Sequence, residues 1–407
     1  MKPLIKKTMI VPRYVAQFRC IGGECPETCC AGWNISVDKQ TFASYKTSSD
    51  TVLKPLLHEH LKRNRLATSD GQFGSLKLNP QSGHCGLQAS DGLCQVQTRL
   101  GEDALSDTCH SYPRTTRLID GQYEQALTLS CPEAARLALL SPDGFEFVAE
   151  PLIGRTSAVL KASHMPGFDD MSVYATRTWA MQLIHTRELS VTDRLAVLGL
   201  LCDQIDMLIR ERRHADLHML LEQLTQLVES GAVLEGVAGL PHNAMLQVQL
   251  FASLFLGNAP SARFPRQLEM FATIARGMSA GKVGPLDQET MVKQYCRGHE
   301  LTQAKPEIDE ILERYLLNEA FGGLFPWGYS SPYQHYQRLV VCFGIIRWML
   351  ASVAAAYDRS PTAEEAVQVI QVFSRLYQHN RQFTENVEGL LERCGWNSLH
   401  KLYMVLK

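Results

Sequence analysis

Cysteine is the residue type with the clearest chemical potential in this 407-residue chain, because eight of its twelve cysteines fall within the first 131 residues. The densest stretch, FRCIGGECPETCCAGW, runs from Phe18 to Trp33 and contains two adjacent thiols. Cysteine thiolates are ligands of structural zinc and of iron–sulfur clusters. We therefore predict a metal or redox role for the set Cys20, Cys25, Cys29, Cys30, Cys85, Cys94, Cys109 and Cys131.

The spacing of these thiols leaves three alternatives open: an iron–sulfur cluster, a zinc site, and thiols without metal. Zinc ribbons and fingers commonly use two CxxC-type knuckles, and the sequence has no CxxC pair. An iron–sulfur cube takes four thiolates, so the eight thiols allow one metal site or two. Downstream cysteines such as Cys202 and Cys342 lie in apolar settings and are expected to be small core residues.

Composition and charge indicate a globular protein with no electrostatic reason to bind nucleic acid or an anionic membrane. Forty basic and forty-two acidic residues leave a formal net charge of -2, and 45% of the residues are apolar. The N-terminal stretch MKPLIKKTMIVPRYV lacks the apolar core of a secretory signal. We therefore expect a cytoplasmic protein with reduced thiols rather than disulfides.

The best candidate for a membrane span is Leu339–Tyr357, LVVCFGIIRWMLASVAAAY. Arg347 lies near its middle, where a charged side chain costs about 2.5–3.5 kcal/mol on insertion scales. We predict a buried helix of a bundle instead, and no membrane partner.

Turn signals divide the N-terminal part into short elements that must position the thiols. Asp38 is the predicted N-cap of a helix over residues 39–46, and a second helix is predicted over residues 51–65. Strands at 116–119 and 123–129 flank a turn and predict a hairpin. Ser130 and Glu133 form a capping-box pattern, so a helix is expected to begin at Cys131. Its thiol would then lie near the positive end of the helix dipole, where a thiolate is favoured.

From about Met171 onward the chain is amphipathic at helical spacing, with few strand signals. The segment SPDGFEFVAEPLIGRTSA, which ends near residue 158, is the expected junction. The predicted fold is therefore mainly α. A cysteine-rich, metal-binding module with a short hairpin spans residues 1–155, and an α-helical bundle follows over residues 156–407.

Three motifs, CC-x-GW, TC-x-x-YPR and SCPEAARL, occur in this order in the N-terminal part, and RYLLNEAFGGLFPWG follows in the helical part. Together they resemble the flagellin lysine-N-methylase family. The N-terminal part also resembles cysteine-cluster domains with a CxxCxxCC-like signature that chelate zinc or iron. The resemblance covers most of the chain.

The resemblance implies an enzyme that methylates surface lysines of flagellin with S-adenosylmethionine as methyl donor. It also implies a [4Fe–4S] cluster held by the cysteines, with zinc as the alternative. A different class of function stays open beside it: a zinc- or iron-chelating protein that acts as a non-catalytic binding or adaptor module.

Polar and aromatic residues near the thiols are the candidates for binding the donor. Arg114 can pair with the donor carboxylate, and Trp33 or Tyr112 can stack on adenine or contact the sulfonium. Tyr112 and Asp38 are the catalytic candidates, although Asp38 also suits a helix cap. Asn318, with the nearby segment FPWGY, is predicted to form a second wall of the site.

Overall fold

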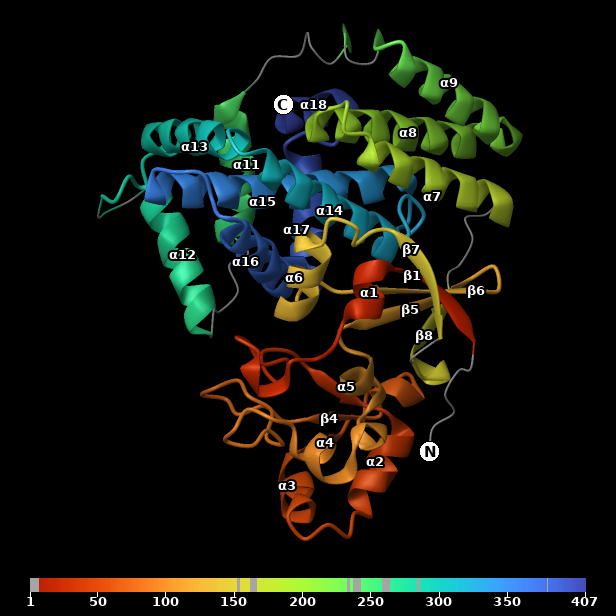
Figure 1. Ribbon diagram of the computed structural model, residues 1–407, viewed down its shortest axis with the longest axis vertical. Helices are drawn as coiled ribbons and strands as arrows, with labels where there is room; N and C mark the ends of the chain where they lie inside the picture. Colours follow the sequence, from red (N-terminus) through yellow and green to blue (C-terminus); the bar gives the residue numbers. More distant parts are fainter. Residues whose placement is uncertain are drawn as a thin grey trace. The chain divides into compact units, whose positions relative to one another are not determined.

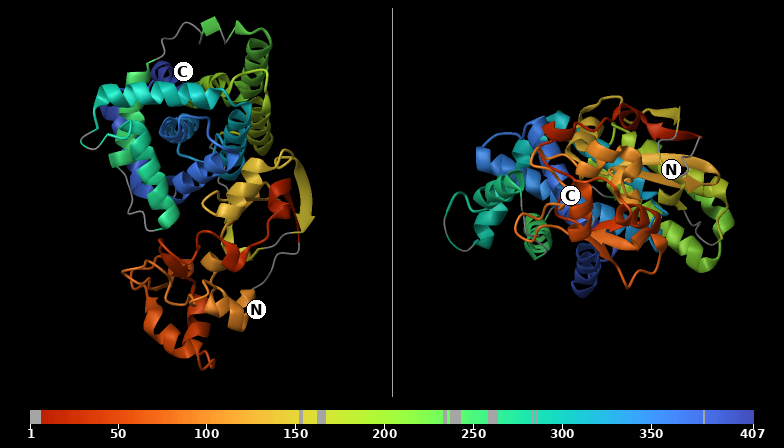
Figure 2. Two further views of the ribbon diagram at one scale, coloured as in Figure 1. Left: turned by 60° about the vertical axis from the view of Figure 1, so that its left-hand side comes forward. Right: turned by 90° about the horizontal axis from the view of Figure 1, so that it is seen from below.

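The computed structural model describes residues 7–151, 154–161, 167–232, 235–236, 243–257, 264–282, 284, 286–378 and 380–407 (Figures 1 and 2). Contacts divide the chain into two compact units. The N-terminal unit comprises Met1–Leu137 and Glu146–Lys161, and the helical unit comprises Ala138–Phe145 and Ala162–Lys407. The predicted division between residues 155 and 156 stays a prediction.

A five-stranded sheet forms one part of the N-terminal unit, with strand order β7-β1-β6-β5-β8. Its strands are β1 (Thr8–Pro12), β5 (Arg114–Ile119), β6 (Gln122–Leu127), β7 (Phe147–Pro151) and β8 (Val159–Lys161). Helix α1 (Arg13–Gln17) packs on β1, β6 and β7 (Figure 1). Helix α6 (Pro132–Leu140) begins shortly after β6.

The predicted hairpin is confirmed, because β5 and β6 pair antiparallel in the register Ile119↔Gln122. Asp120 and Gly121 both have positive φ, as two-residue hairpin turns that match the strand twist require. The sheet around this hairpin was not predicted. β7 and β8 lie in the expected junction segment, and β7 pairs antiparallel with β1 while β8 pairs parallel with β5.

The second part of the N-terminal unit is a small sheet with order β2-β4-β3 and four short helices. Its elements are β2 (Ile35–Val37), α2 (Lys39–Lys46), α3 (Leu53–His60), β3 (Leu61–Arg63), β4 (Gly74–Leu76), α4 (Gln95–Leu100) and α5 (Asp107–Ser111). Short 3-10 turns lie at Gly22–Glu24, Asp70–Gln72, Glu102–Ala104 and Thr156–Ala158.

Two helix predictions in this part have different outcomes. The helix over residues 39–46 is confirmed with Asp38 as its N-cap. The helix predicted over residues 51–65 is wrong at its end, because α3 stops at His60 and Leu61–Arg63 forms β3. The pairing Leu61↔Leu76 places Leu61 in the core. The conformation of Leu61–Arg63 is therefore set by its strand partner and not by local helix propensity.

The helical unit contains the long helices of the chain. They are α7 (Asp170–His185), α8 (Val191–Glu211), α9 (Leu217–Glu229), α11 (Ala244–Gly257), α12 (Pro265–Met278), α13 (Gln288–Gln303), α14 (Pro306–Gly323), α15 (Pro332–Tyr357), α16 (Ala363–Phe373), α17 (Arg381–Arg393) and α18 (Leu399–Leu406). A π-helical turn at Ser374–Gln378 follows α16. The prediction of a mainly helical fold is confirmed, together with a sheet that is larger than a hairpin.

Helix α15 runs through the middle of the helical unit, with other helices around it (Figures 1 and 2). It is long and apolar enough to cross a membrane, but 89% of its most apolar window is buried inside the structure. The Arg347 guanidinium donates to the Leu406 carbonyl of α18 at 2.7 Å. Gly277 and Gly298 let α12 and α13 approach the α15 backbone, since a Cβ at either position would lie 1.9 Å from a carbonyl oxygen. The predicted buried bundle helix is confirmed.

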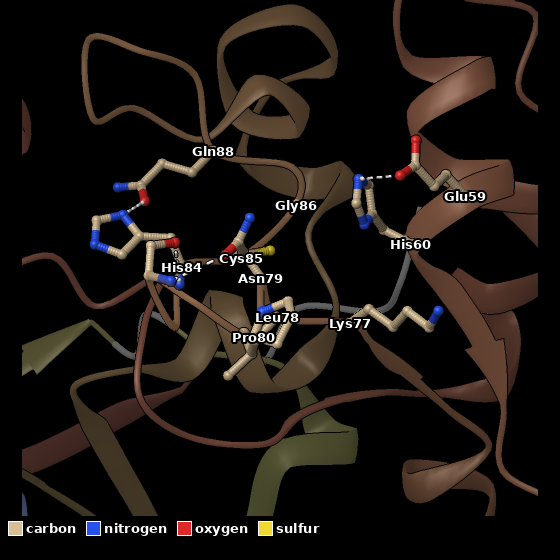
Figure 3. A pocket seen from close by; sticks show the side chains of 11 residues that line it. Glu59, His60, Lys77, Leu78, Asn79, Pro80, His84, Cys85, Gly86 and Gln88 are labelled. Carbon is tan, nitrogen blue, oxygen red and sulfur yellow. Dashed lines mark hydrogen bonds and ion pairs between the residues drawn. The ribbon is translucent and has the colours of Figure 1, made fainter. Parts of the chain in front are cut away.

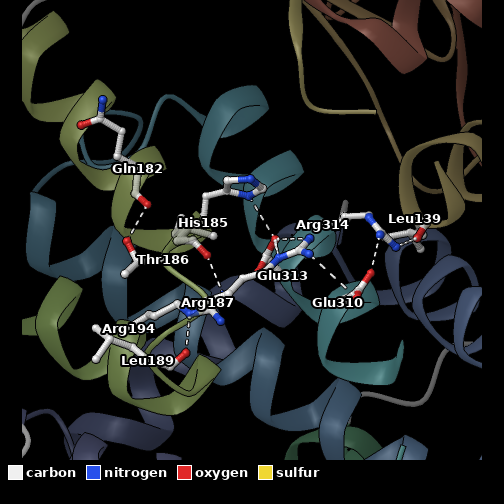
Figure 4. Close-up of polar contacts among 11 residues, drawn as sticks. Leu139, Gln182, His185, Thr186, Arg187, Leu189, Arg194, Glu310, Glu313 and Arg314 are labelled. Carbon is white, nitrogen blue, oxygen red and sulfur yellow. Dashed lines mark hydrogen bonds and ion pairs between the residues drawn. The ribbon is translucent and has the colours of Figure 1, made fainter. Parts of the chain in front are cut away.

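A buried carboxylate joins α7, α8 and α14 within the helical unit (Figure 4). Glu313 accepts from Arg194 at 2.7 Å, and both side chains are almost fully buried. Arg187 and His185 approach the same carboxylate at 3.1 and 3.0 Å from its more exposed side. Because Arg194 also donates to the carbonyls of Leu189 and Ile184, this ion pair is well satisfied.

Candidate metal and donor-binding site

Backbone hydrogen bonds bring the cysteine-bearing segments of the N-terminal unit together. The Cys85 amide donates to the Cys30 carbonyl at 2.7 Å. Isolated bridges pair Ala31 with His84, Leu78 with Cys85, and Gln88 with Cys94. Residues more than fifty positions apart in sequence are therefore neighbours in this unit.

Four thiols share one environment, and we call them the buried thiol set. They are Cys30, Cys85, Cys94 and Cys109. Cys85 belongs to the apolar core around β2, β4 and β3, and the other three pack against that core. Burial raises the pKa of Cys85 to about 11 and that of Cys109 to about 12. A hydrogen bond from Cys30 instead lowers the pKa of Cys94 to about 6, while the side-chain hydrogen bonds of Cys30 to Cys29 and to Cys94 raise the pKa of Cys30.

The remaining thiols of the N-terminal unit are Cys20, Cys25, Cys29 and Cys131. Cys20 and Cys29 are exposed, Cys25 is half-buried, and Cys131 is buried at the start of α6. Cys25 and Cys29 lie near Cys131, and Cys20 and Cys131 lie near the side chain of Arg114.

The predicted thiolate at Cys131 is wrong in direction. The amides of Glu133 and Ala134 donate to its sulfur and lower its pKa, as a helix N-terminus should. Burial outweighs these bonds and raises the pKa to about 12. Cys131 thus occupies the capping position that was predicted for Ser130, and the Glu133 carboxylate pairs with Arg136 at 2.7 Å.

Backbone amides donate to three of the eight sulfurs. Cys85 accepts from Leu87, Cys94 from Val96 and Gln97, and Cys131 from Glu133 and Ala134. Each donor lies two or three residues after its cysteine, so the turn following each thiol supplies positive partial charge. Such bonds favour the thiolate form that metals require.

The residue types suit zinc or an iron–sulfur cluster, because thiolates are ligands of both and amides donate to three of the sulfurs. Within the part of the chain that the structure describes, however, no three His, Cys, Asp or Glu side chains are placed to hold one metal ion together. Binding a metal therefore requires the thiols to move closer to one another. The predicted metal-binding character of this unit stays a prediction.

The structure brings the predicted donor-binding residues Trp33 and Tyr112 together. Their ring centroids lie 5.7 Å apart, and the Trp33 indole donates to the Cys29 carbonyl at 2.7 Å. The Tyr112 hydroxyl lies 3.2 Å from that of Ser130, the residue before Cys131. An aromatic pair therefore connects the backbone of Cys29 with Ser130.

The guanidinium of Arg114 lies in an unusual environment for a charged group. Its side chain is half-buried and lies over the Phe18 ring at 5.2 Å. It makes no hydrogen bond to the residues that the structure describes. Burial lowers its pKa, so an anionic partner would be favoured there.

Two other predicted residues have structural contacts. Asp38 accepts from the Thr41 amide at 2.9 Å and from the Asp107 amide at 3.1 Å, so it caps α2 and also binds the start of α5. Asn318 is buried in α14 of the helical unit. The predicted catalytic role of Asp38 and donor-binding role of Asn318 stay predictions, as does the catalytic role of Tyr112.

A polar cleft of about 520 Å³ lies beside the buried thiol set in the N-terminal unit (Figure 3). His84 and Gln88 line it from one side and Glu59 and His60 from the other, with Cys85 between them. Its volume is that of a small-molecule site. Sequence reasoning missed this cleft, although the HC dipeptide in HCGLQ was a usable signal.

The Gln88 amide fixes the orientation of His84. Its nitrogen donates to the Gly92 carbonyl and to Thr28, each at 2.8 Å. The amide oxygen therefore faces Nδ1 of His84, 2.8 Å away, so in the neutral ring Nδ1 carries the proton. One side chain thus ties the loop before Cys29 and Cys30 to the wall of the cleft.

Comparison with known proteins finds relatives of part of the chain. It is 35% identical over 152 residues to proteins named lysine-N-methylase from Salmonella typhimurium and Salmonella choleraesuis. This stretch spans 37% of the chain and 37% of each of those relatives. It is also 35% identical over 139 residues to the flagellar biosynthetic protein FliU of Salmonella muenchen, which covers 33% of the chain and 79% of that relative. No solved structure matches the chain.

A family model described as the FliB lysine N-methylase C-terminal domain matches residues 177–405. The matched residues make up more than half of the sequence. They lie within the helical unit. The chain therefore belongs to the FliB lysine N-methylase family.

Proposed function

We propose that this chain is a protein-lysine N-methyltransferase that methylates surface lysines of flagellin with S-adenosylmethionine. Membership of the FliB lysine N-methylase family is the observation that carries this proposal. The flagellar name of a third relative supports flagellin as the protein substrate.

The proposal places the methyl donor beside Arg114, near Cys20 and Cys131. The half-buried guanidinium of Arg114 would pair with the donor carboxylate, for which bidentate geometry suits Arg. The paired rings of Trp33 and Tyr112 would contact the adenine or the sulfonium. The hydrogen bonds of these rings to the Cys29 carbonyl and to Ser130 hold them in place.

The proposed transfer is a displacement at carbon. A lysine with a reference pKa of about 10.4 must first lose its proton to a base, either solvent water or one of the predicted catalytic candidates Tyr112 and Asp38. Its nitrogen then forms a bond to the methyl carbon while the carbon–sulfur bond breaks, which releases S-adenosylhomocysteine and methyl-lysine. The protein contributes desolvation of the amine and alignment of the two reacting atoms.

We further propose that four of the eight N-terminal thiols hold a [4Fe–4S] cluster, with zinc as the alternative. A bound cluster would supply a redox-active or donor-docking metal centre in this unit. The amide bonds to the sulfurs of Cys85, Cys94 and Cys131 support thiolate ligands. The thiols lie outside the residues that the family model matches.

Incubation of the full chain with flagellin and methyl-labelled donor tests the activity, with mass spectrometry to locate modified lysines. Label on flagellin lysines and formation of S-adenosylhomocysteine are expected. No transfer by protein that contains its metal would contradict the methylase proposal and favour the adaptor alternative. Formation of 5′-deoxyadenosine would contradict the displacement and indicate a radical transfer of the methyl group.

Arg114→Gln tests the donor site, with Arg136→Gln as the matched control. Both arginines are in the N-terminal unit, but Arg136 is exposed and already paired with Glu133. We expect Arg114→Gln to raise the KM for the donor at least about tenfold, which is a loss of about 1.4 kcal/mol, and the control to leave it unchanged. Equal KM values in both variants would contradict the placement of the donor at Arg114.

A further inference from the structure

A buried arginine fixes the short 3-10 turn that precedes α5. Arg155 is 2% exposed, and it donates to the carbonyls of Asp103 at 2.9 Å and Leu105 at 2.6 Å. Its guanidinium also lies 3.4 Å from the Glu102 carbonyl and 3.1 Å from the Asp107 carboxylate. Because one buried side chain holds both ends of this turn, the Glu102 side chain projects from a fixed piece of backbone.

The carboxylate of Glu102 faces α5 but forms no hydrogen bond there. Its Oε1 lies 3.9 Å from Nε2 of His110, which is too long for a hydrogen bond. Among the residues that the structure describes, no donor bonds to either oxygen of this carboxylate. The side chain is 56% exposed, so a ligand at the surface of the N-terminal unit can reach it.

A guanidinium without a partner lies near this carboxylate. Arg114 follows the end of α5 by three residues, and its guanidinium lies over the Phe18 ring. Glu102 is the charged group that acts most strongly on Arg114, yet in the described part of the chain no ion pair or hydrogen bond joins them. Nδ1 of His110, whose side chain is 6% exposed, is also buried there without a partner. Unsatisfied polar groups of this kind are uncommon in folded proteins, and a bound ligand is one way to satisfy them.

A carboxylate and a guanidinium that lie near each other unpaired complement the two charges of a free α-amino acid. A guanidinium binds a carboxylate by two parallel hydrogen bonds, and a carboxylate accepts charge-assisted bonds from an ammonium. The ammonium and carboxylate of an α-amino acid are attached to the same carbon, so one ligand can satisfy Arg114 and Glu102 together. The Trp33–Tyr112 pair adjoins them, because Tyr112 lies between His110 and Arg114 in the sequence.

We propose that Glu102 binds the α-ammonium group of the methyl donor while Arg114 binds its carboxylate. The identity of the ligand rests on the proposed function, which assigns the carboxylate to Arg114 and leaves the ammonium without a partner. An adenosine compound without the amino-acid end leaves both charges of the site unmatched, and the Glu102 carboxylate repels the phosphate of a nucleotide. The N-terminal unit therefore selects the donor over other adenosine compounds by its free amino-acid end.

Calorimetric titration of the full chain with adenosine thioethers tests this assignment. The reference ligand is S-adenosylhomocysteine, which has the complete amino-acid end. The compound 5′-deoxy-5′-(3-carboxypropylthio)adenosine keeps the carboxylate and lacks the ammonium, whereas 5′-deoxy-5′-(3-aminopropylthio)adenosine keeps the ammonium and lacks the carboxylate. Glu102→Gln and Arg114→Gln are compared with the wild type. Asp103→Asn is the matched control, because Asp103 is the exposed neighbour of Glu102 in the same turn.

The two variants should lose affinity for different ligands. Glu102→Gln should weaken the binding of S-adenosylhomocysteine at least about fivefold, which is a loss of about 1 kcal/mol. It should not weaken the binding of the carboxypropyl compound, because that ligand has no ammonium. Arg114→Gln should weaken the binding of S-adenosylhomocysteine and of the carboxypropyl compound, but not of the aminopropyl compound. Asp103→Asn should bind all three ligands as the wild type does.

Two kinds of result would overturn the role of Glu102 and leave the proposed methylase function standing. One is an unchanged affinity of Glu102→Gln for S-adenosylhomocysteine. The other is an equal weakening of S-adenosylhomocysteine and the carboxypropyl compound, which would assign Glu102 a structural role.

Hydrogen exchange of residues 102–114 is measured in parallel, and unchanged protection in Glu102→Gln is expected. If the wild type does not bind S-adenosylhomocysteine at all, both the ammonium site and the proposed use of S-adenosylmethionine would be overturned.

Discussion

The two units of this chain stabilise buried polar groups in different ways. In the helical unit the Arg194–Glu313 ion pair lies among long helices that pack around α15. In the N-terminal unit the side chain of Arg155 is 2% exposed, and most of its hydrogen bonds go to backbone carbonyls. Its guanidinium donates to the carbonyls of Leu105 at 2.6 Å and Asp103 at 2.9 Å, and to the Asp107 carboxylate at 3.1 Å.

This difference follows from the elements that each unit contains. Long helices satisfy their own backbone except at their ends and bury continuous apolar faces, and the two carbonyls that accept from Arg194 lie at or just outside a helix end. Short strands and irregular loops leave carbonyls and amides that other groups must satisfy. Arg155 and Asp38 perform that task in the N-terminal unit, and Cys109 lies in α5, directly after the segment that they hold.

Breaking the buried ion pair should have the largest effect on stability. Glu313→Ala leaves the Arg194 guanidinium buried without its carboxylate, which costs about 3–5 kcal/mol. Chemical denaturation with hydrogen exchange should show this loss in the helical unit. Glu133→Ala removes an ion pair whose arginine is exposed and should change stability by less than about 1 kcal/mol. Similar losses in the two variants would contradict the special role of the buried pair.

Replacing Arg155, which bonds to backbone carbonyls of the N-terminal unit, should have the second largest effect on stability. Arg155→Met keeps the volume of the side chain but leaves the carbonyls near Leu105 without a donor, at about 2–4 kcal/mol. Exchange should rise around α5 and leave the helical unit unchanged. Arg136→Met is the control, because that arginine is exposed. Unchanged exchange around α5 would show that Arg155 is not what holds this segment.

Removing the Asp38 carboxylate, which accepts from two backbone amides, should reduce the stability of the same unit by a smaller amount. Asp38→Ala loses the bonds to Thr41 and Asp107, at about 1–3 kcal/mol. Asp38→Asn retains a capping oxygen and should recover part of this stability. If Asp38 instead acts as a base, Asp38→Asn would abolish methyl transfer while stability is retained. Measuring both quantities on the two variants separates these roles.

The smallest expected effect is a pH dependence in the helical unit. The hydrogen bond from Arg359 holds the pKa of Glu365 below its ordinary value of 4.5. Because the pKa is depressed in the folded state, the stabilisation is present above about pH 5 and disappears as the pH falls through the folded pKa. The difference in unfolding free energy between wild type and Glu365→Gln should therefore shrink between pH 6 and pH 3, by about 1 kcal/mol or less. A difference in unfolding free energy that does not change with pH would contradict the proposed stabilisation by the Arg359–Glu365 pair.

Local signals made several elements predictable. Asp38 before an amphipathic octapeptide predicts the cap of α2, and Asp120-Gly121 between two strand-forming runs predicts the β5–β6 turn. The apolar run around Arg347 predicts a buried helix, because its charge disfavours a membrane span. In each case neighbouring residues carry the decisive interaction.

Other features depend on partners that are remote in sequence. Leu61–Arg63 becomes β3 only because β4 pairs with it, and Phe147–Pro151 becomes β7 only through β1. The pKa of Cys131 rises because of burial, which a helix-dipole argument cannot supply. The bonds of Arg155 to residues about fifty positions away have no local signal at all.

The sequence by itself determined the mainly helical fold, the family and the concentration of eight thiols in the N-terminal part, because composition, periodicity and motif order are local properties. Only the tertiary structure decided which thiols are buried and which contact one another. Burial and hydrogen bonds depend on chain segments that meet in space, so Cys30 contacts Cys94 although the two are remote in sequence.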